Sequence, residues 1–159
     1  GRAAAVAAPA GLLLWTLQAV CLPDGVSLLT GLSRSLDGLG RLMGLDGILL
    51  TAFLLGFPAN EIVLPIALML YLSQGSLTEL GSAVELRSIL TAQGWSWQTA
   101  ACMLWFTLFH WPCSTTLLTI RKETGSLRWT ALAFLLPTLA GILGCILLAQ
   151  LGRLGGRLF

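Results

Sequence analysis

A polar break inside apolar sequence constrains the fold of this chain more than any other feature. Residues 45–55 and 62–72 are almost wholly apolar, and Gly-Phe-Pro-Ala-Asn-Glu lies between them at residues 56–61. Glycine and proline interrupt helices, and lipid cannot satisfy the backbone groups that such a break leaves free. A carboxylate at membrane depth is costly, so Glu61 is expected to face protein or water. The sequence therefore predicts a discontinuous membrane helix with a polar site at its break.

The composition is that of a membrane protein. Hydrophobic residues make up 56% of the 159 residues and charged residues 10%, whereas soluble domains carry roughly 25% charged residues. At about 20 residues per span, the length allows about four or five membrane helices. The net charge is only +2 and the basic residues are scattered at segment ends, which argues against nucleic acid as a partner. We predict an all-α, polytopic helical membrane protein whose main partner is the lipid bilayer.

Three further segments precede the C-terminal half. Residues 3–20 are apolar and predict a first span, kinked at Pro9. Residues 26–45 carry leucines at helical spacing and charges between them, which is typical of an amphipathic helix at the membrane interface. A short surface helix is expected within residues 73–94, the most polar stretch. The chain begins without an initiator Met or a cleavable signal peptide, so we expect it to be a piece of a longer protein.

A second break lies in the C-terminal half. Residues 99–109 are apolar and are followed by His-Trp-Pro-Cys-Ser-Thr-Thr at residues 110–116. We expect a charged loop at residues 121–126 and a full-length final span at residues 129–151, with a proline at position 137. The sequence thus predicts two broken helices.

The two breaks hold the intramembrane polar groups. Glu61 is the only acidic residue inside an apolar stretch, and His110, the only histidine, lies inside another. We therefore predict that the breaks meet and form one composite site. Half-helices of about 11 residues reach about half of the hydrocarbon thickness, so each broken segment either crosses the membrane or returns as a re-entrant hairpin.

Three residues are predicted metal ligands. Glu61 has no Lys or Arg in the surrounding apolar sequence, which disfavours a structural ion pair. Asn60 adds an amide oxygen and is also suited to cap the second half-helix. Cys113 follows a proline at the opening of a half-helix, where the helix dipole favours a thiolate. A thiolate suits a soft or borderline metal ion.

Other polar residues of the second break have several interpretations. His110, Ser114 and Thr115 are expected to line a pathway, with His110 a further potential metal ligand. His110 and Cys113 also suggest a catalytic Cys–His pair, but Pro112 interrupts the helical register and no third orienting group is evident. No phosphate-binding GxxxxGK[ST] loop occurs, so nucleotide hydrolysis is not expected and we predict no enzymatic activity.

The remaining cysteines carry no evident chemistry. The chain has no CxxC motif, and the cysteine spacing suits neither a zinc knuckle nor a disulfide framework. Cys102 and Cys145 lie in apolar stretches and are expected to be small, inert, buried hydrophobic residues.

Six motifs are longer and more specific than these patterns. They are RAAAVAAPAG at 2–11, GLDG at 44–47, GFPANEI at 56–62, HWPCSTT at 110–116, KETGS at 122–126 and WTALAF at 129–134. Together they closely resemble the membrane domain of FeoB, a family of bacterial ferrous iron transporters, over nearly the whole chain. The resemblance implies a partial transmembrane transport domain at 1–159, with the second gate repeat at about 1–94 and C-terminal spans at about 95–159.

The resemblance also assigns roles. It places Asn60 and Glu61 in the family's second-gate break and Cys113 in its later Pro-Cys motif, and it implies that both breaks line the path of Fe2+. Fe2+ is then the transported substrate, with no permanently bound cofactor. The implied location is the bacterial inner (cytoplasmic) membrane, in a multi-pass arrangement. The implied partners are an N-terminal GTPase domain, a first gate repeat and small Feo accessory proteins. No GTPase domain is found in this sequence, so GTP would act only through a domain outside it.

Two other classes of function stay open from the residues. Related gate sequences occur in transporters of organic solutes such as nucleosides, which need a roomier pocket with aromatic and hydrogen-bonding groups. A non-transporting membrane scaffold would instead leave Glu61 and Cys113 dispensable.

Overall fold

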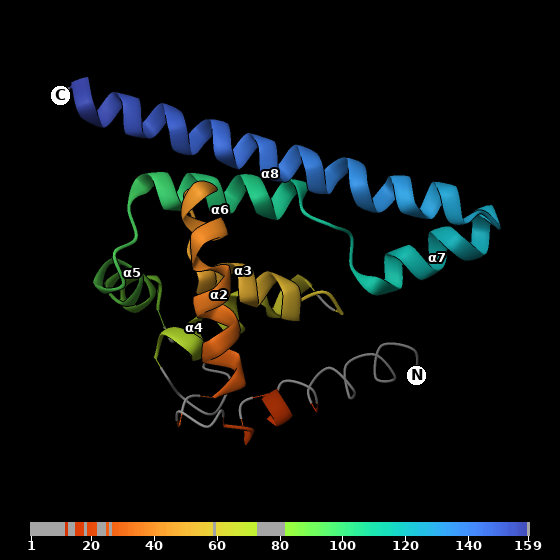
Figure 1. Ribbon diagram of the computed structural model, residues 1–159, viewed down its shortest axis with the longest axis horizontal. Helices are drawn as coiled ribbons and strands as arrows, with labels where there is room; N and C mark the ends of the chain where they lie inside the picture. Colours follow the sequence, from red (N-terminus) through yellow and green to blue (C-terminus); the bar gives the residue numbers. More distant parts are fainter. Residues whose placement is uncertain are drawn as a thin grey trace.

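The computed structural model describes residues 12, 15–17, 19–21, 25, 27–58, 60–72 and 82–158. The predicted first span at residues 3–20 lies mostly outside them. The named elements of the described chain are all helices (Figure 1). They are α2 (Leu28–Leu42), α3 (Gly47–Leu55), the 3-10 turn η1 (Asn60–Ile62), α4 (Val63–Tyr71), α5 (Ala83–Ala92), α6 (Trp97–Phe109), α7 (Ser114–Thr124) and α8 (Leu127–Leu158).

Short polar residues set the beginnings of four helices. In each, a side-chain oxygen of the N-cap residue accepts a hydrogen bond from the backbone N–H three positions further along the chain. This bond satisfies one of the free donors of the first turn. The N-caps of α2, α3, α5 and α6 are Ser27, Asp46, Ser82 and Ser96. These polar residues directly precede the helices that the sequence predicted.

The charged loop predicted at residues 121–126 is wrong for its first four positions. Residues 121–124 complete α7, and Gly125 ends the helix in the left-handed conformation with φ 61°. Glycine adopts this conformation at no steric cost. Arg121 and Lys122 lie in the last turn of α7, where basic side chains interact favourably with the helix dipole.

The first break reverses the chain. α3 and α4 pack against each other, and the hydroxyl of Tyr71, the last residue of α4, donates to the carboxylate of Asp46, the N-cap of α3. The start of α3 and the end of α4 therefore lie together, and residues 56–58 and 60–62 lie at the tip of an antiparallel helical hairpin. Of the two arrangements open from the sequence, this segment adopts the hairpin.

The second break keeps the chain direction. Gln98 and Trp105 of α6 donate to the carbonyls of Ala149 and Ala140 on α8, at 2.8 and 3.3 Å, so these two helices are antiparallel. α7 continues along the N-terminal part of α8 after an extended link (Figure 1). α6 and α7 thus form one interrupted helix beside the continuous α8.

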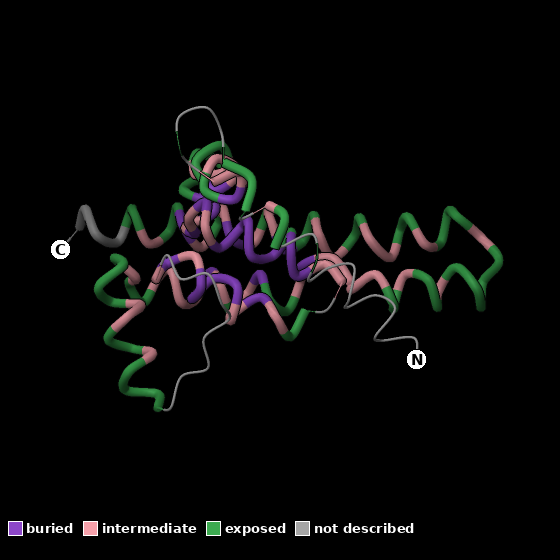
Figure 2. Tube along the Cα trace, turned by 90° about the horizontal axis from the view of Figure 1, so that it is seen from below, coloured by how far each residue is buried: buried purple, intermediate pink, exposed green. Residues whose placement is uncertain are grey.

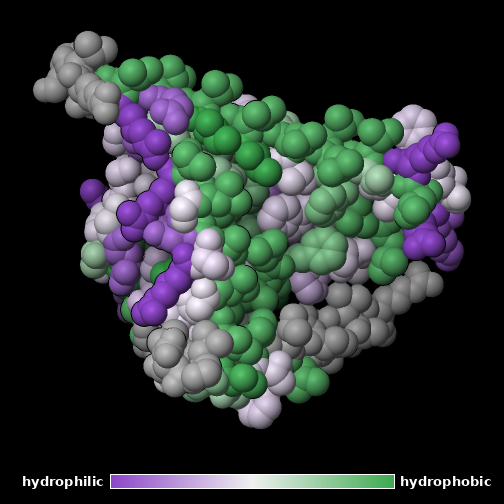
Figure 3. Space-filling view, viewed as in Figure 1, coloured by the Kyte–Doolittle hydropathy of each residue, from purple (hydrophilic) through white to green (hydrophobic). Residues whose placement is uncertain are grey.

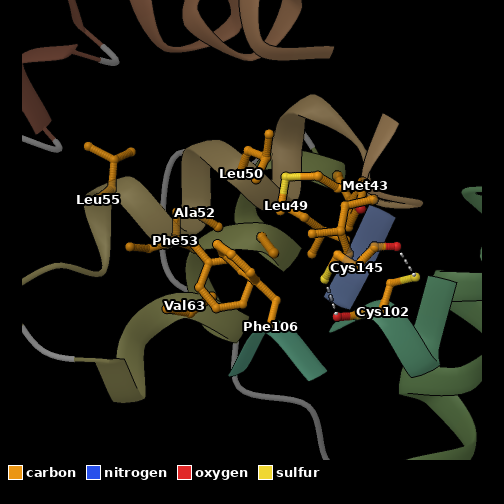
Figure 4. Packing of buried hydrophobic residues seen from close by; sticks show 14 of the residues in the cluster. Met43, Leu49, Leu50, Ala52, Phe53, Leu55, Val63, Cys102, Phe106 and Cys145 are labelled. Carbon is orange, nitrogen blue, oxygen red and sulfur yellow. Dashed lines mark hydrogen bonds between the residues drawn. The ribbon is translucent and has the colours of Figure 1, made fainter. Parts of the chain in front are cut away.

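The core lies where the hairpin meets α2, α6 and α8. Buried residues gather at the centre of the molecule, away from both ends of α8 (Figure 2). Phe53 of α3 meets Phe106 of α6 edge to face, with ring centroids 4.8 Å apart. Cys102 and Cys145 are fully buried, and each thiol lies against the other residue's carbonyl oxygen (Figure 4). Their predicted burial is confirmed.

The outer surface suits a membrane. Apolar side chains cover much of the face seen in Figure 3, and hydrophilic ones gather towards its two sides. Among the described residues, 127–154 of α8 form one helix long and apolar enough to cross a bilayer. α2 and α3 pass the same test only as a pair bent by 110°. Exposed leucines along α8 are consistent with contact with lipid; they are Leu132, Leu135, Leu136, Leu139, Leu143, Leu147, Leu151 and Leu154.

Candidate functional site

The two breaks touch. The backbone N–H of Ser114, at the start of α7, donates to the carbonyl of Phe57, in the tip of the hairpin, at 2.9 Å. His110, at the end of α6, packs against Phe53, with ring centroids 5.1 Å apart. The second break therefore lies across the C-terminal end of α3. Phe57 lies just beyond Gly56, the C-cap of α3, and Ser114 gives its carbonyl a hydrogen-bond partner.

Asn60 and Glu61 lie on η1 at the hairpin tip, and both are exposed. Among the described residues, neither side chain has a hydrogen bond or an ion pair. The N-cap of α4 is Ile62, with no side-chain cap bond, so the expected capping of α4 by Asn60 is wrong. The amide and carboxylate oxygens therefore remain available for an external ligand.

Cys113 is the N-cap of α7, which confirms that it lies at the opening of a half-helix. Its Sγ lies 3.0 Å from the hydroxyl of Thr115 and 3.1 Å from that of Thr116. Both hydroxyls are able to donate to the sulfur, and the N-terminus of the helix adds positive potential. The half-buried Cys113 sulfur thus lies beside two hydroxyl groups at the start of α7. Thr116 was not among the predicted site residues.

His110 is enclosed rather than open. It is 8% exposed, its Nδ1 lies 2.9 Å from the carbonyl oxygen of Thr107, and its Nε2 has no partner among the described residues. The backbone of both His110 and Cys113 is extended, so they do not share a helix face. Cys113 pairs with threonine hydroxyls instead, and the geometry gives no support to a catalytic Cys–His pair.

Sequence reasoning missed a second polar region at the open end of the hairpin. There the Tyr71 hydroxyl donates to Asp46 and accepts from Nε1 of Trp95 at 3.0 Å. Asp37 on α2 accepts from the N–H of Gly47 at 3.2 Å and pairs with Arg41 at 2.7 Å. A cavity of about 500 Å³ adjoins these groups. Its lining residues are Thr30, Ser33, Arg34, Asp37, Asp46, Gly47, Ile48, Leu70, Tyr71 and Gln93.

One signal in the sequence pointed to this region. Asp46 directly precedes an apolar run and lies in the GLDG motif, a position typical of the N-cap of a buried helix. Its contact with Tyr71, 25 positions away, depends on the hairpin, which the sequence left undecided.

The described residues do not bring three His, Cys, Asp or Glu side chains together as a metal cluster. The chemistry on offer at the breaks is mixed: an exposed carboxylate and amide at the tip, a thiol with two hydroxyls at α7, and a buried imidazole. Such a set suits a cation that is bound transiently and keeps part of its water shell better than a permanently held ion.

Comparison with known proteins identifies a family for this chain. The Gate family, described as nucleoside recognition, matches residues 2–127. The Fe(2+) transporter FeoB of Leptospira biflexa serovar Patoc is 32% identical over 121 residues, which are 72% of this chain and 17% of that relative. No solved structure matches the chain. The chain therefore belongs to the Gate family and corresponds to part of a FeoB-type membrane domain.

Proposed function

We propose that this chain forms part of the path by which Fe2+ crosses the bacterial inner membrane. The observation that carries the proposal is the contact between the two breaks, made by the bond from Ser114 N–H to the Phe57 carbonyl. It joins two interrupted apolar helices at their polar points. Irregular backbone at membrane depth is tolerated where protein covers it or where it lines a wet cavity. The 32% identity to a protein named as an Fe(2+) transporter supports iron as the cargo.

The lengths of the helices support a position of this contact near the middle of the bilayer. α3 and α4 have nine residues each and so reach about 14 Å, close to half of a hydrocarbon core of about 30 Å. In the proposed arrangement, the hairpin enters from one side, and α6 and α7 cross beside α8 with their break at the same depth. The protein is then multi-pass.

The site residues have complementary roles in the proposal. Glu61 supplies the negative charge that attracts a divalent cation, and Asn60 an uncharged oxygen. Cys113 supplies sulfur, and His110, Ser114 and Thr115 of the same segment line the path opposite the tip of the hairpin. Zn2+ and Cu2+ bind such ligands more tightly than Fe2+ does, so geometry and availability rather than affinity set the selectivity. Weak binding at several points allows release on the far side.

The partners of the chain follow from the same proposal. Residues of about 1–94 act as a second gate repeat, with C-terminal spans at about 95–159, and work with a first repeat, a GTPase domain and small Feo accessory proteins. GTP hydrolysis then belongs to the GTPase domain, and this chain itself is not an enzyme.

A nucleoside-like solute is the second candidate cargo. The family description names nucleoside recognition, and the cavity of about 500 Å³ beside Asp46 and Tyr71 lies within the size range of small-molecule sites. Its mixed lining includes Tyr71, Gln93 and Arg34, which offer hydrogen bonds to a polar ligand.

The test is uptake of radioactive iron by cells that express the intact gene product, with Glu61→Gln as the variant. Gln keeps the size of Glu but removes the charge, so we expect normal expression and at least a tenfold lower uptake rate at limiting Fe2+. Glu85→Gln, on the exposed α5, is the matched control and leaves uptake unchanged. Unchanged uptake in Glu61→Gln contradicts the iron path, and uptake of labelled nucleoside in place of iron supports the second candidate.

A further inference from the structure

Three buried polar atoms in the second break have no hydrogen-bond partner among the described residues. They are Nε2 of His110, Nε1 of Trp111 and Oγ of Ser114. A buried polar group that has lost water and gained no partner is destabilising, and in native proteins such groups are rare. All three lie within five residues, in the segment whose Ser114 contacts Phe57 of the first break.

The hydrogen bond of His110 fixes the tautomer of its ring. Nδ1 lies 2.9 Å from the carbonyl oxygen of Thr107, and a carbonyl only accepts, so Nδ1 carries the hydrogen. In the neutral ring, Nε2 then holds a lone pair. A metal-binding histidine almost always donates its other ring N–H to a carbonyl, a carboxylate or a water, which fixes its tautomer and orientation. His110 is held in this way.

The aromatic rings around His110 provide no hydrogen-bond donor for Nε2. The ring lies among Phe53, Phe106 and Trp111, at centroid distances of 5.1, 5.9 and 5.9 Å. Aromatic carbon cannot donate a hydrogen bond of ordinary strength to a lone pair. Phe53 belongs to the hairpin and Phe106 to α6, so the ring lies between the two interrupted helices.

The other two orphaned atoms belong to the same short segment as His110. The indole Nε1 of Trp111 is a donor only, and the hydroxyl of Ser114 is both donor and acceptor. The backbone N–H of Ser114 is used in the bond to Phe57, whereas its side-chain hydroxyl has no partner among the described residues. A hydrated cation or a water molecule bound in the second break would also be available as a partner to these two atoms.

We propose that Nε2 of His110 is a direct ligand of the divalent cation that passes through the second break. This assignment rests on the proposed transport function and adds to it an enclosed nitrogen ligand. Imidazole nitrogen suits first-row transition ions such as iron, whereas Mg2+ and Ca2+ prefer oxygen. An enclosed nitrogen ligand therefore gives the path a preference against the abundant hard cations.

The test uses Mn2+ alone as the probe and the purified intact gene product under anaerobic conditions. Electron spin echo spectroscopy detects nitrogen bound directly to Mn2+, and labelling with 15N-histidine identifies that nitrogen as imidazole. We expect a histidine coupling that changes on labelling, is lost in His110→Gln and is kept in Trp97→Phe, at an exposed residue outside both breaks. We also expect at least a tenfold loss of Mn2+ affinity in His110→Gln.

The wild-type spectrum alone keeps the proposal falsifiable if His110→Gln does not fold. Bound Mn2+ with no histidine nitrogen coupling overturns it and leaves ordered water as the partner of Nε2. A coupling that persists in a folded His110→Gln protein also overturns it. Iron uptake measured on the same preparation separates the two claims, because uptake without nitrogen coupling refutes this ligand while leaving the transport function intact.

Discussion

The corner between α2 and α3 gives the sharpest test of the packing. An added Cβ at Gly47 would lie 1.9 Å from the carbonyl oxygen of Ser33 and 2.8 Å from the backbone nitrogen of Asp37. Both are backbone atoms of α2 and cannot rotate away. To restore a contact of about 3.5 Å, α2 must move by about 1.6 Å. That movement breaks the bond from Gly47 N–H to Asp37, now 3.2 Å long.

Gly47→Ala is therefore expected to be strongly destabilising. Overpacking costs about 1–3 kcal/mol and the lost hydrogen bond about 0.5–1.5 kcal/mol. A total near 3 kcal/mol lowers the melting temperature by about 6–12 °C in a protein of this size. The assay is thermal unfolding of the detergent-solubilised protein, followed by tryptophan fluorescence and by loss of the monodisperse peak in size-exclusion chromatography.

Gly38→Ala is the matched control on the same helix. No atom lies within 4 Å of an added Cβ there, and replacing a mid-helix glycine by alanine stabilises by about 0.5–1 kcal/mol. We expect its melting temperature to equal or exceed that of the wild type. If Gly47→Ala melts at the wild-type temperature, or if both variants fall equally, the described contact between α2 and α3 is refuted.

Two further predictions concern the two polar regions. Tyr71→Phe removes the hydroxyl that joins Asp46 to Trp95 and leaves the hydrogen-bonding groups of both residues without this partner. We therefore expect a loss of about 1–3 kcal/mol in the free energy of unfolding. Trp97→Phe, at a 78% exposed residue, is the control, and equal stability of the two variants contradicts the network. In a Cys21→Ser background, a small water-soluble thiol reagent is expected to label Cys113 well before the fully buried Cys102 and Cys145. Faster labelling of either buried cysteine contradicts the proposal that water reaches Cys113 in the second break.

The elements were largely predictable because their signals are local. The break at residues 56–61 showed itself through glycine and proline between apolar runs, and Cys113 at a half-helix opening followed from the proline before it. Ser82 and Ser96, which the sequence analysis did not single out, cap α5 and α6 by the same kind of local chemistry. The charged stretch at 121–124 misled the prediction because polarity alone does not end a helix, and the stop signal was Gly125.

The remaining features depend on contacts between distant residues. Half-helices of this length fit both a crossing segment and a re-entrant hairpin, so the sequence did not decide between them. The hairpin is closed by the hydrogen bond between Tyr71 and Asp46, which are far apart in the sequence. The capping role expected of Asn60 failed because a 3-10 turn separates it from α4. The free Nε2 of His110 follows from its bond to Thr107 and from the rings around it, which no sequence pattern records.

The central claim is that the two breaks serve one cation, and protection of Cys113 by Fe2+ tests it most directly. The measurement is the labelling rate of Cys113 under anaerobic, reducing conditions, with and without Fe2+, in wild type and in Glu61→Gln. If the ion lies between Glu61 and Cys113, Fe2+ slows labelling in the wild type, and the protection shifts to at least tenfold higher Fe2+ in Glu61→Gln. Equal protection in both proteins, or none in the wild type, contradicts a shared site.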